Sequence, residues 1–369
     1  MKNSDTYKLC ANLLSIRHEG NATELTNLPC SEEDWQQFVQ VGNRHLILPS
    51  LYLALKSNTK IEQYNPELIQ TLSYIYYLNK KRNLRIIEQA KEINDLLKSN
   101  NIEPIFLKGV ANLIDNLYLD IGDRIIYDID VLVPPEQFIK AFEVLKEANY
   151  FSETPINTKA LASIKHAPPQ CKEGMPSFVE IHKSAMGYQY EKLLTYTEIS
   201  KNSTIILYDN LEFRIMNLQH RIIHNFIHSQ LQHRGYKLGN VSLRDAYDLY
   251  LLYNKTNQID YFKNMQKHKV KAYGYLLFMH QLFNQTTPSY LNNNKYDKQN
   301  TRYLKKLDKA VPTTFLSNYL IPRLEKYTIQ PFTMLWDKGS INYIYSRLID
   351  PTWYKRKWCR IQDLLSGRE

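Results

Sequence analysis

Apolar residues recur at helical spacing through the first hundred positions of the chain. The longest such run lies between residues 66 and 100, and its second half places apolar residues at steps of four, three and four: Ile86, Ala90, Ile93 and Leu97. This spacing puts them on one face of a long helix. Shorter helices are predicted at 33–41 and 49–55. We therefore expect residues 1–100 to form an N-terminal helical region.

Between residues 101 and 216 short apolar runs replace the helical spacing. Runs with the character of strands lie at 102–109, 124–134, 160–167, 177–184, 204–208 and 211–216. Helices are expected at 110–119 and after the proline pair at 134–135, since proline suits the first turn of a helix. Asp209 and Asn210 separate the last two runs and predict a hairpin turn. We interpret 101–216 as an α/β core.

Helical spacing returns at residue 217 and predicts a mainly helical C-terminal domain over 217–369. The polar stretch 292–300 is the best candidate for a loop or linker. The run at 345–365 mixes aromatic residues with Lys and Arg. That mixture suits contacts with nucleic acid or an amphipathic helix that packs its tryptophans inward, and we favour the helix.

The charge of the chain points to phosphate-bearing partners. The 47 Lys and Arg residues outnumber the 37 Asp and Glu residues, which gives a net charge of +10. Such a surface attracts nucleotides or nucleic acid. The chain lacks both the ~18 consecutive apolar residues of a membrane helix and the pattern of a signal peptide. We expect a cytoplasmic protein with no membrane partner.

Two carboxylates interrupt the apolar run 124–134. Alternation along a strand puts Asp128 and Asp130 on the same face. Neighbouring carboxylates repel each other, whereas Mg²⁺ prefers oxygen ligands and leaves coordination positions for substrate phosphates. Glu180 lies in a later apolar run, and if the two strands pair, three carboxylates can hold two metal ions. The alternative is three exposed polar positions on half-buried strands.

Three histidines share one face of the helix that begins near residue 217, because His220, His224 and His228 are spaced four residues apart. Histidines at this spacing can bind zinc, but the metalloprotease pattern with an intervening Glu is absent. We favour core or interface histidines, with Asp245 and Asp248 of the next helix as hydrogen-bond partners. A contribution to an acceptor pocket is the alternative.

The segment FLKGVANLIDNLYLDIGDRIIYDIDVLV, at 106–133, resembles the central motif of the uncharacterised nucleotidyltransferase family of bacteria, which belongs to the DNA polymerase β-like superfamily. The shared features are Leu-Lys-Gly, a Tyr that ends a helix, a loop with Arg, and Asp-hydrophobic-Asp. The later VEIH, the upstream NRHLILPSLYLAL, and the downstream HRIIHNFIH and LRDAYDLYLL are also similar to this family. The resemblance covers residues 43–252.

This resemblance implies an α+β fold, with a short mixed sheet and helices at the core, flanked by N-terminal and C-terminal helical regions. It also implies transfer of a nucleoside monophosphate from a nucleoside triphosphate to an acceptor, with release of pyrophosphate. Asp128 and Asp130 match the metal-binding pair and Glu180 the third carboxylate, with magnesium or manganese as the ion. The acceptor is left open among a small molecule, a protein side chain and an RNA end.

Four further residues are candidates for substrate binding. The superfamily usually carries Gly-Ser before the metal strand, whereas this chain has Lys108 and Gly109 with no Ser following. Gly109 still lets backbone N–H groups approach a phosphate, and Lys108 adds a point charge. Arg124 can clamp a phosphate or pair with Asp120 or Asp123 in a surface loop. His182 shares the strand face of Glu180 and can orient a carboxylate, contact the nucleotide or be structural.

Three functions are compatible with these patterns: an active nucleotidyltransferase, a catalytically degenerate binding module, and a nucleic-acid-binding protein that acts through its basic surface. Retention of both metal aspartates favours an active nucleotidyltransferase, and the missing Ser favours a catalytically degenerate module that binds nucleotide or RNA. The phosphate-binding pattern GxxxxGK[ST] is absent, which excludes a P-loop enzyme.

Overall fold

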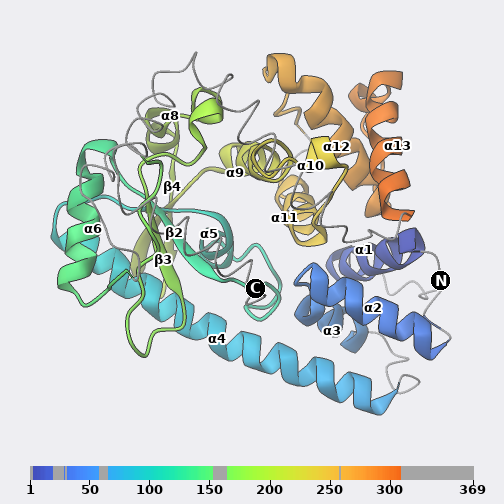
Figure 1. The fold of residues 1–369 in the computed structure, drawn as a ribbon, viewed down its shortest axis with the longest axis horizontal. Coiled ribbons are helices and arrows are strands. Elements are labelled where there is room, and N and C mark those ends of the chain that lie inside the picture. Colours follow the sequence, from blue (N-terminus) through green and yellow to red (C-terminus); the bar gives the residue numbers. More distant parts are fainter. Residues whose placement is uncertain are drawn as a thin grey trace, which may run out of the picture.

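The computed structural model of the protein describes residues 3–19, 29, 31–57, 65–152, 164–256 and 259–308. Figure 1 shows a twisted sheet crossed by one long helix, with further helices gathered on one side of it. The α+β class predicted from the sequence, a mixed core flanked by helices, is confirmed. The predicted run at 345–365 and residues 160–163 lie outside the described ranges.

The described chain before the sheet is helical. The helices are α1 (Asn3–Glu19), α2 (Glu32–Arg44), α3 (Leu48–Lys56) and α4 (Pro66–Ser99). Asn65 caps α4 by accepting hydrogen bonds from the backbone of its first turn, and Pro66 follows at the first helical position, where its missing N–H costs nothing. Among the described helices, none is both long and apolar enough to span a bilayer.

Helix α4 fixes the loops around the sheet through amide side chains on its buried face. The Asn79 and Asn83 side chains donate to carbonyl oxygens of the loop at 121–124. Gln89 exchanges two hydrogen bonds with the backbone of Ser177, immediately before strand β3 (Phe178–His182). Buried backbone groups need such partners. The helix therefore holds in place the segments that enter the two carboxylate-bearing strands.

The sheet has five strands in the order β3-β2-β1-β5-β4. The other bounds are β1 (Ile105–Phe106), β2 (Asp128–Leu132), β4 (Thr204–Tyr208) and β5 (Leu211–Ile215). Strand β2 is parallel to β3 and antiparallel to β1, β1 is parallel to β5, and β5 is antiparallel to β4. The predicted hairpin is confirmed, and Asp209 and Asn210 both have positive φ, as tight two-residue hairpin turns require.

The remaining elements of the core are α5 (Lys108–Ile114), the 3-10 turn η2 (Pro135–Gln137), α6 (Phe138–Glu147), the 3-10 turn η3 (Tyr188–Leu193) and α8 (Tyr196–Lys201). Strand β1 is shorter than the predicted 102–109, because α5 begins at Lys108. The helix predicted at 110–119 ends at Ile114, where the chain turns toward the loop at 121–124. Of the predicted strand at 160–167, the described part forms only an isolated bridge between His166 and His182.

After the sheet the described chain is helical. The elements are α9 (Leu218–Phe226), a π-helical turn η4 (Ile227–Gln232), α10 (Gly235–Leu238), α11 (Leu243–Asn254), η5 (Gln266–His268), α12 (Lys269–Leu282), η6 (Ser289–Leu291) and α13 (Asn294–Asp308). The predicted loop at 292–300 is wrong, since α13 begins at Asn294. This polar stretch opens an amphipathic helix whose buried apolar residues, Tyr303 and Leu307, come later in the sequence, and its own Gln299 and Asn300 are buried as well.

Candidate active site

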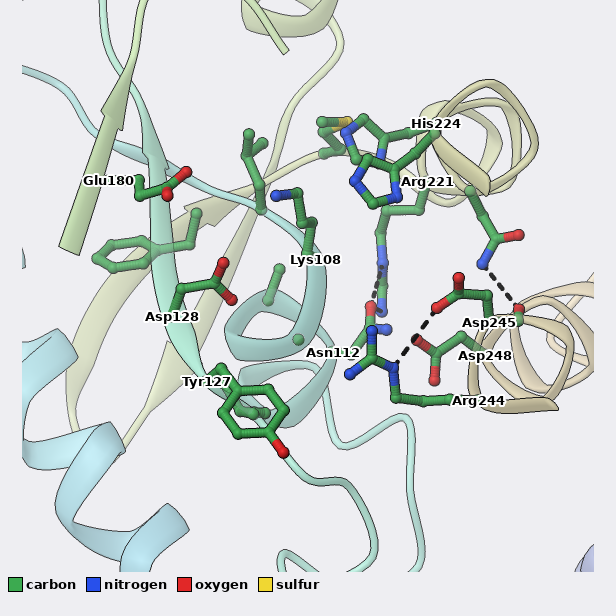
Figure 2. A pocket seen from close by; sticks show the side chains of 18 of the residues that line it. Lys108, Asn112, Tyr127, Asp128, Glu180, Arg221, His224, Arg244, Asp245 and Asp248 are labelled. Atoms are coloured by element: carbon green, nitrogen blue, oxygen red, sulfur yellow. Dashed lines mark hydrogen bonds and ion pairs between the residues drawn. The ribbon is translucent and has the colours of Figure 1, made fainter. Parts of the chain in front are cut away.

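A cavity of about 450 Å³ lies between the sheet and the helices that follow it. Figure 2 shows Asp128 and Glu180 projecting into it from β2 and β3, while Arg221 and His224 of α9 and Arg244 of α11 face them from the other side. The polar cavity walls thus come from elements far apart in the sequence. Its size is within the range of roughly 300–1,000 Å³ that is usual for small-ligand sites.

The two carboxylate strands are in a register that places Asp130 directly opposite Glu180. Because β2 and β3 are parallel, both side chains project from the same face of the sheet. Potential ligand atoms of Asp130, Glu180 and His182 lie within 4.8 Å of one another. Asp128 lies outside this group, about 6.6 Å further along the strand, and reaches the same cavity.

Asp130 lies at the buried base of this group, with two donors on one oxygen. The Lys108 Nζ donates to Asp130 Oδ1 at 2.6 Å, and the His182 Nε2 donates to the same oxygen at 2.8 Å. Burial alone would raise the pKa of the Asp130 carboxyl, but these two contacts outweigh burial and hold the pKa well below its usual range. Asp130 is therefore ionised and oriented at any physiological pH.

The pKa of Asp128 moves in the opposite direction. Burial raises it, and repulsion from Asp130 and Glu180 raises it further, while Lys108 lowers it only partly. The Glu180 carboxylate lies beside two imidazoles. Its Oε2 is 3.5 Å from His182 Nε2 and 3.6 Å from His166 Nδ1. Lys108 contacts Asp130, and the nearby Lys165 ammonium also attracts Asp130 and Glu180, so that the three carboxylates outnumber the ammonium groups beside them.

Lys108 owes its position to an unusual backbone conformation. Its φ is +51°, a left-handed value that is uncommon for a residue with a side chain and that concentrates at functional positions. Leu107, just before it, donates its backbone N–H to the Asp130 carbonyl, which ties the end of β1 to β2. The sharp change of direction at Lys108 turns its side chain back over Asp130.

Gly109 lies at the strand-to-helix turn, as predicted. A Cβ atom at this position would lie 3.0 Å from Ile126 Cγ1, closer than ordinary contact, so that glycine lets α5 approach the segment before β2 without displacing the Ile126 side chain. Because α5 has only seven residues, its dipole contributes little, and the charge of Lys108 is the main attraction for an anion at this turn.

Arg124 has a different partner from those predicted. Its guanidinium makes a bidentate ion pair with Asp248 of α11, with the shortest contact at 2.8 Å between Nη2 and Oδ2. Both side chains are more than nine-tenths buried. Asp120 and Asp123, the expected partners, pair instead with Lys80 and Arg17. Arg124 thus lines the cavity, but its guanidinium is already paired with Asp248.

The histidine stripe divides between the core and the cavity. His224 and His228 line the cavity, whereas His220 does not. Asp248 is taken by Arg124, and no hydrogen bond between Asp245 or Asp248 and these histidines is found in the described chain. Burial lowers the pKa of His224 to about 3, and the Lys108 ammonium adds to the effect. The imidazole is therefore neutral at physiological pH.

A π-helical turn brings a further histidine to this wall. Within η4 the backbone N–H of His233 donates to the carbonyl of His228, five residues earlier. The wider turn places the two rings together, with their Nε2 atoms 3.1 Å apart. π-Helical turns frequently occur at functional sites. The four-residue spacing in the sequence indicated the stripe of His220, His224 and His228. It did not indicate His233, which reaches His228 because the hydrogen bond of the π-helical turn spans five residues.

Lys165, His166 and Arg244 also line the cavity, and sequence analysis missed them. Lys165 and His166 stand in a run that was assigned as an ordinary strand, and Arg244 opens a helix that was noted only for its aspartates. No local pattern marks them as functional. Their common feature, a position beside the carboxylate strands, exists only after the chain has folded.

Residues 31–284 match a protein family described as "Uncharacterised nucleotidyltransferase". The match covers more than half of the chain. The chain belongs to this nucleotidyltransferase family. The family assignment made from the sequence is thereby confirmed. Comparison with curated proteins and with solved structures gives no match.

The family match includes both carboxylate strands, the turn at Lys108 and Gly109, and helices α9 and α11. All the elements that form the cavity therefore belong to the nucleotidyltransferase unit. The match ends at residue 284, before α13 begins at Asn294. The catalytic and binding roles of the individual residues remain predictions, and the geometry above provides their support.

Proposed function

We propose that this protein transfers a nucleoside monophosphate from a nucleoside triphosphate to an acceptor hydroxyl with the help of divalent metal ions. The observation that carries the proposal is the register of β2 and β3, which sets Asp130 opposite Glu180 and brings Asp128 to the same cavity. Family membership supports the reaction class. The cavity offers a carboxylate side for metal ions and a cationic side for phosphates.

The donor set fits a hard divalent cation. The three carboxylates outnumber the ammonium groups of Lys108 and Lys165 beside them. Asp128 is repelled by the other two carboxylates, so that a bound cation would relieve this repulsion. Carboxylate oxygens suit Mg²⁺, and the imidazole of His182 beside them is also compatible with Mn²⁺. Asp128, Asp130 and Glu180 would hold the ions. A metal ion at this site supplies charge neutralisation for phosphoryl transfer.

The triphosphate would lie between the carboxylates and the basic side chains of the cavity. Lys108 stands at the turn before α5, and Lys165 and Arg244 line the same cavity. Arg221 supports this wall, since its guanidinium donates to Asn112 Oδ1 at 2.8 Å and to Asp115 Oδ2 at 2.5 Å. These cations would bind the nucleotide by charge, without the Ser that is usual in the superfamily.

In the reaction, the acceptor oxygen attacks the α-phosphorus of the triphosphate. A new phosphorus–oxygen bond forms, the bond between the α-phosphorus and the bridging oxygen to the β-phosphate breaks, and pyrophosphate leaves with that oxygen. The proton of the acceptor hydroxyl passes to the Glu180 carboxylate, which faces the cavity. Positioning and charge neutralisation supply most of the catalysis in reactions of this kind.

The test is incubation of the protein with each α-labelled nucleoside triphosphate, Mg²⁺ or Mn²⁺ and a cell extract as the source of acceptor. We expect a labelled product with one triphosphate, identified by mass spectrometry, and none with the Asp128→Asn variant. In parallel, the affinity of the protein for each nucleoside triphosphate is measured, because a catalytically degenerate module would bind nucleotide without transferring it. If the wild type binds nucleotide but labels nothing with any metal or extract, the protein is a binding module and the proposed reaction is wrong.

A further inference from the structure

Two hollows beside the catalytic cavity are lined by cations and by no carboxylate. The first, of about 300 Å³, lies between α10 and α13 and includes Lys298, Arg302, Lys305 and Lys306. The second, of about 420 Å³, includes Arg44, Arg244 and again Lys306. We call these six side chains the basic track. In a protein with a net charge of +10, this track concentrates positive charge on one surface.

The basic track leads to the catalytic cavity. Gly239 and Lys306 line both hollows, and Arg244 lines both the second hollow and the catalytic cavity. The three spaces are therefore neighbours, and Lys306 and Arg244 each border two of them. Helices α10 and α13 lie on the side of the molecule that is turned away from α6 (Figure 1).

The exposed part of the track combines cations with an aromatic ring. Lys298, Arg302 and Lys305 are exposed on α13. The ring of Tyr236 on α10 has the Arg302 guanidinium 5.8 Å from its centroid and the Lys271 ammonium 4.8 Å from it. Grooves that bind single-stranded nucleic acid use this combination, since cations follow the backbone and aromatic rings stack on bases.

The length of the track suits several successive phosphates. The nine residues from Lys298 to Lys306 span about 12 Å of helix, long enough to contact more than one phosphate of a single strand. A small acceptor would occupy only the catalytic cavity and would not need a second charged surface leading away from it. A chain of phosphates that ends in the cavity uses both.

We propose that the acceptor is the 3′ end of a single-stranded nucleic acid, whose backbone lies along the basic track and whose terminal hydroxyl enters the cavity past Arg244. This inference rests on the proposed function and names its acceptor. The 3′ oxygen attacks the α-phosphorus, the new phosphodiester bond lengthens the strand by one nucleotide, and pyrophosphate leaves. The proton of the hydroxyl goes to Glu180, as above.

The binding arm of the test uses the full-length protein and end-labelled single-stranded RNA and DNA of mixed sequence, measured by fluorescence anisotropy over a range of salt. We expect the Lys298→Glu/Lys305→Glu variant to bind at least about tenfold more weakly at low salt, with a salt slope reduced by about 0.7 for each lost phosphate contact. The matched control, Lys192→Glu/Lys201→Glu, changes the net charge equally on exposed lysines of η3 and α8 and should bind like the wild type.

Several results would overturn the inference. Equal weakening in both variants would mean that binding follows net charge and not the track, and unchanged binding in both would exclude the track. Preference for an acidic or phosphorylated peptide over both nucleic acids would assign the surface to a protein acceptor.

The extension arm separates this inference from the proposed function. With a nucleoside triphosphate and Mn²⁺ or Mg²⁺, the strand should gain one or more nucleotides on a denaturing gel, and a strand blocked by a 3′ phosphate should gain none. If the protein labels a different acceptor in extract while leaving the strand unbound and unextended, the inference fails and the transferase stands. If nothing is labelled, the proposed function fails, and the binding measurements still show whether the basic track binds nucleic acid.

Discussion

The Lys108 ammonium lies 2.6 Å from the Asp130 carboxylate and neutralises it at the base of the cavity. Asp128, two residues earlier on the same strand face, makes no ion pair with the described residues. The pKa of Asp130 is accordingly lowered and that of Asp128 raised. An ionised Asp130 therefore favours the folded state, whereas an ionised Asp128 opposes it, because each shift is a difference in proton affinity between folded and unfolded chains.

Replacing each of the two aspartates by asparagine should consequently have a different effect on the stability of the protein. Asp128→Asn relieves repulsion and should leave the melting temperature unchanged or raise it. Asp130→Asn leaves Lys108 without its partner and should lower stability by about 2–4 kcal/mol, since breaking a mostly buried pair is costly. Both variants should lose nucleotide transfer, because each removes a charge that would hold a metal ion. Thermal and urea unfolding without divalent metal measures the difference.

The double variant Asp130→Asn/Lys108→Met serves as the control for this prediction. It removes the stranded ammonium together with its partner, so that part of the lost stability should return. If Asp128→Asn destabilises the protein as much as Asp130→Asn does, the assignment of the ion pair to Asp130 alone is wrong.

Gly109→Ala should destabilise the protein by about 1–3 kcal/mol. The added Cβ would lie 3.0 Å from Ile126 Cγ1, and overpacking of this kind forces backbone or side-chain shifts. The same shift would move Lys108, so we also expect weaker nucleotide binding. Gly187→Ala is the matched control, because its Cβ would meet Gln232 at an ordinary 3.5 Å. Denaturant unfolding that shows equal stability for both variants would contradict the proposed close approach.

The ion pair between Arg124 and Asp248 should act as a structural tie between the sheet region and α11. Arg124→Met and Asp248→Leu should each cost about 3–5 kcal/mol, because each leaves a buried charge unpaired. The double variant should cost clearly less than the sum. Unfolding measurements on the four proteins give the coupling energy, and a sum without coupling would mean that the pair is not energetically linked.

The same variants test whether Arg124 also contacts phosphate. At a temperature where all remain folded, the two single variants should have similar KM values for the triphosphate if Arg124 is structural. A KM that rises only in Arg124→Met would restore the phosphate role that the sequence suggested for this residue.

Stability should fall as the pH is lowered from about 6.5 to 4, with His18 among the causes. Burial lowers the pKa of His18 to about 4, with Arg17 adding to the effect. The unfolded chain therefore takes up the proton first, and the contribution of neutral His18 is present above pH ~6.5 and lost toward pH ~4. His18→Gln, which can keep the contact with the Tyr247 hydroxyl, should reduce the slope of stability against pH by up to ~1.4 kcal/mol per unit. An unchanged slope would show that His18 does not titrate in this range.

The elements that depend on local chemistry were predictable from the sequence. Two-residue alternation placed Asp128 and Asp130 on one face, and the Asp209–Asn210 turn identified the β4–β5 hairpin, since both features depend on neighbours in the chain. The motif from Leu107 to Asp130 identified the nucleotidyltransferase family. The four-residue spacing of histidines predicted one helix, and His220 and His224 lie on α9, whereas His228 lies in the π-helical turn η4.

Contacts between distant segments were decided only by the tertiary structure. The register that sets Glu180 opposite Asp130 arises from the pairing of two strands 50 residues apart, and no local pattern specifies it. Arg124 bypasses two nearby aspartates for Asp248, because packing of α11 buries the two together. The polar stretch before residue 300 became helix because later residues of α13 pack inward, and His233 reached His228 through a π turn. Sequence determines which groups are present and the local geometry, whereas burial and pairing, which depend on the whole chain, determine which of them meet.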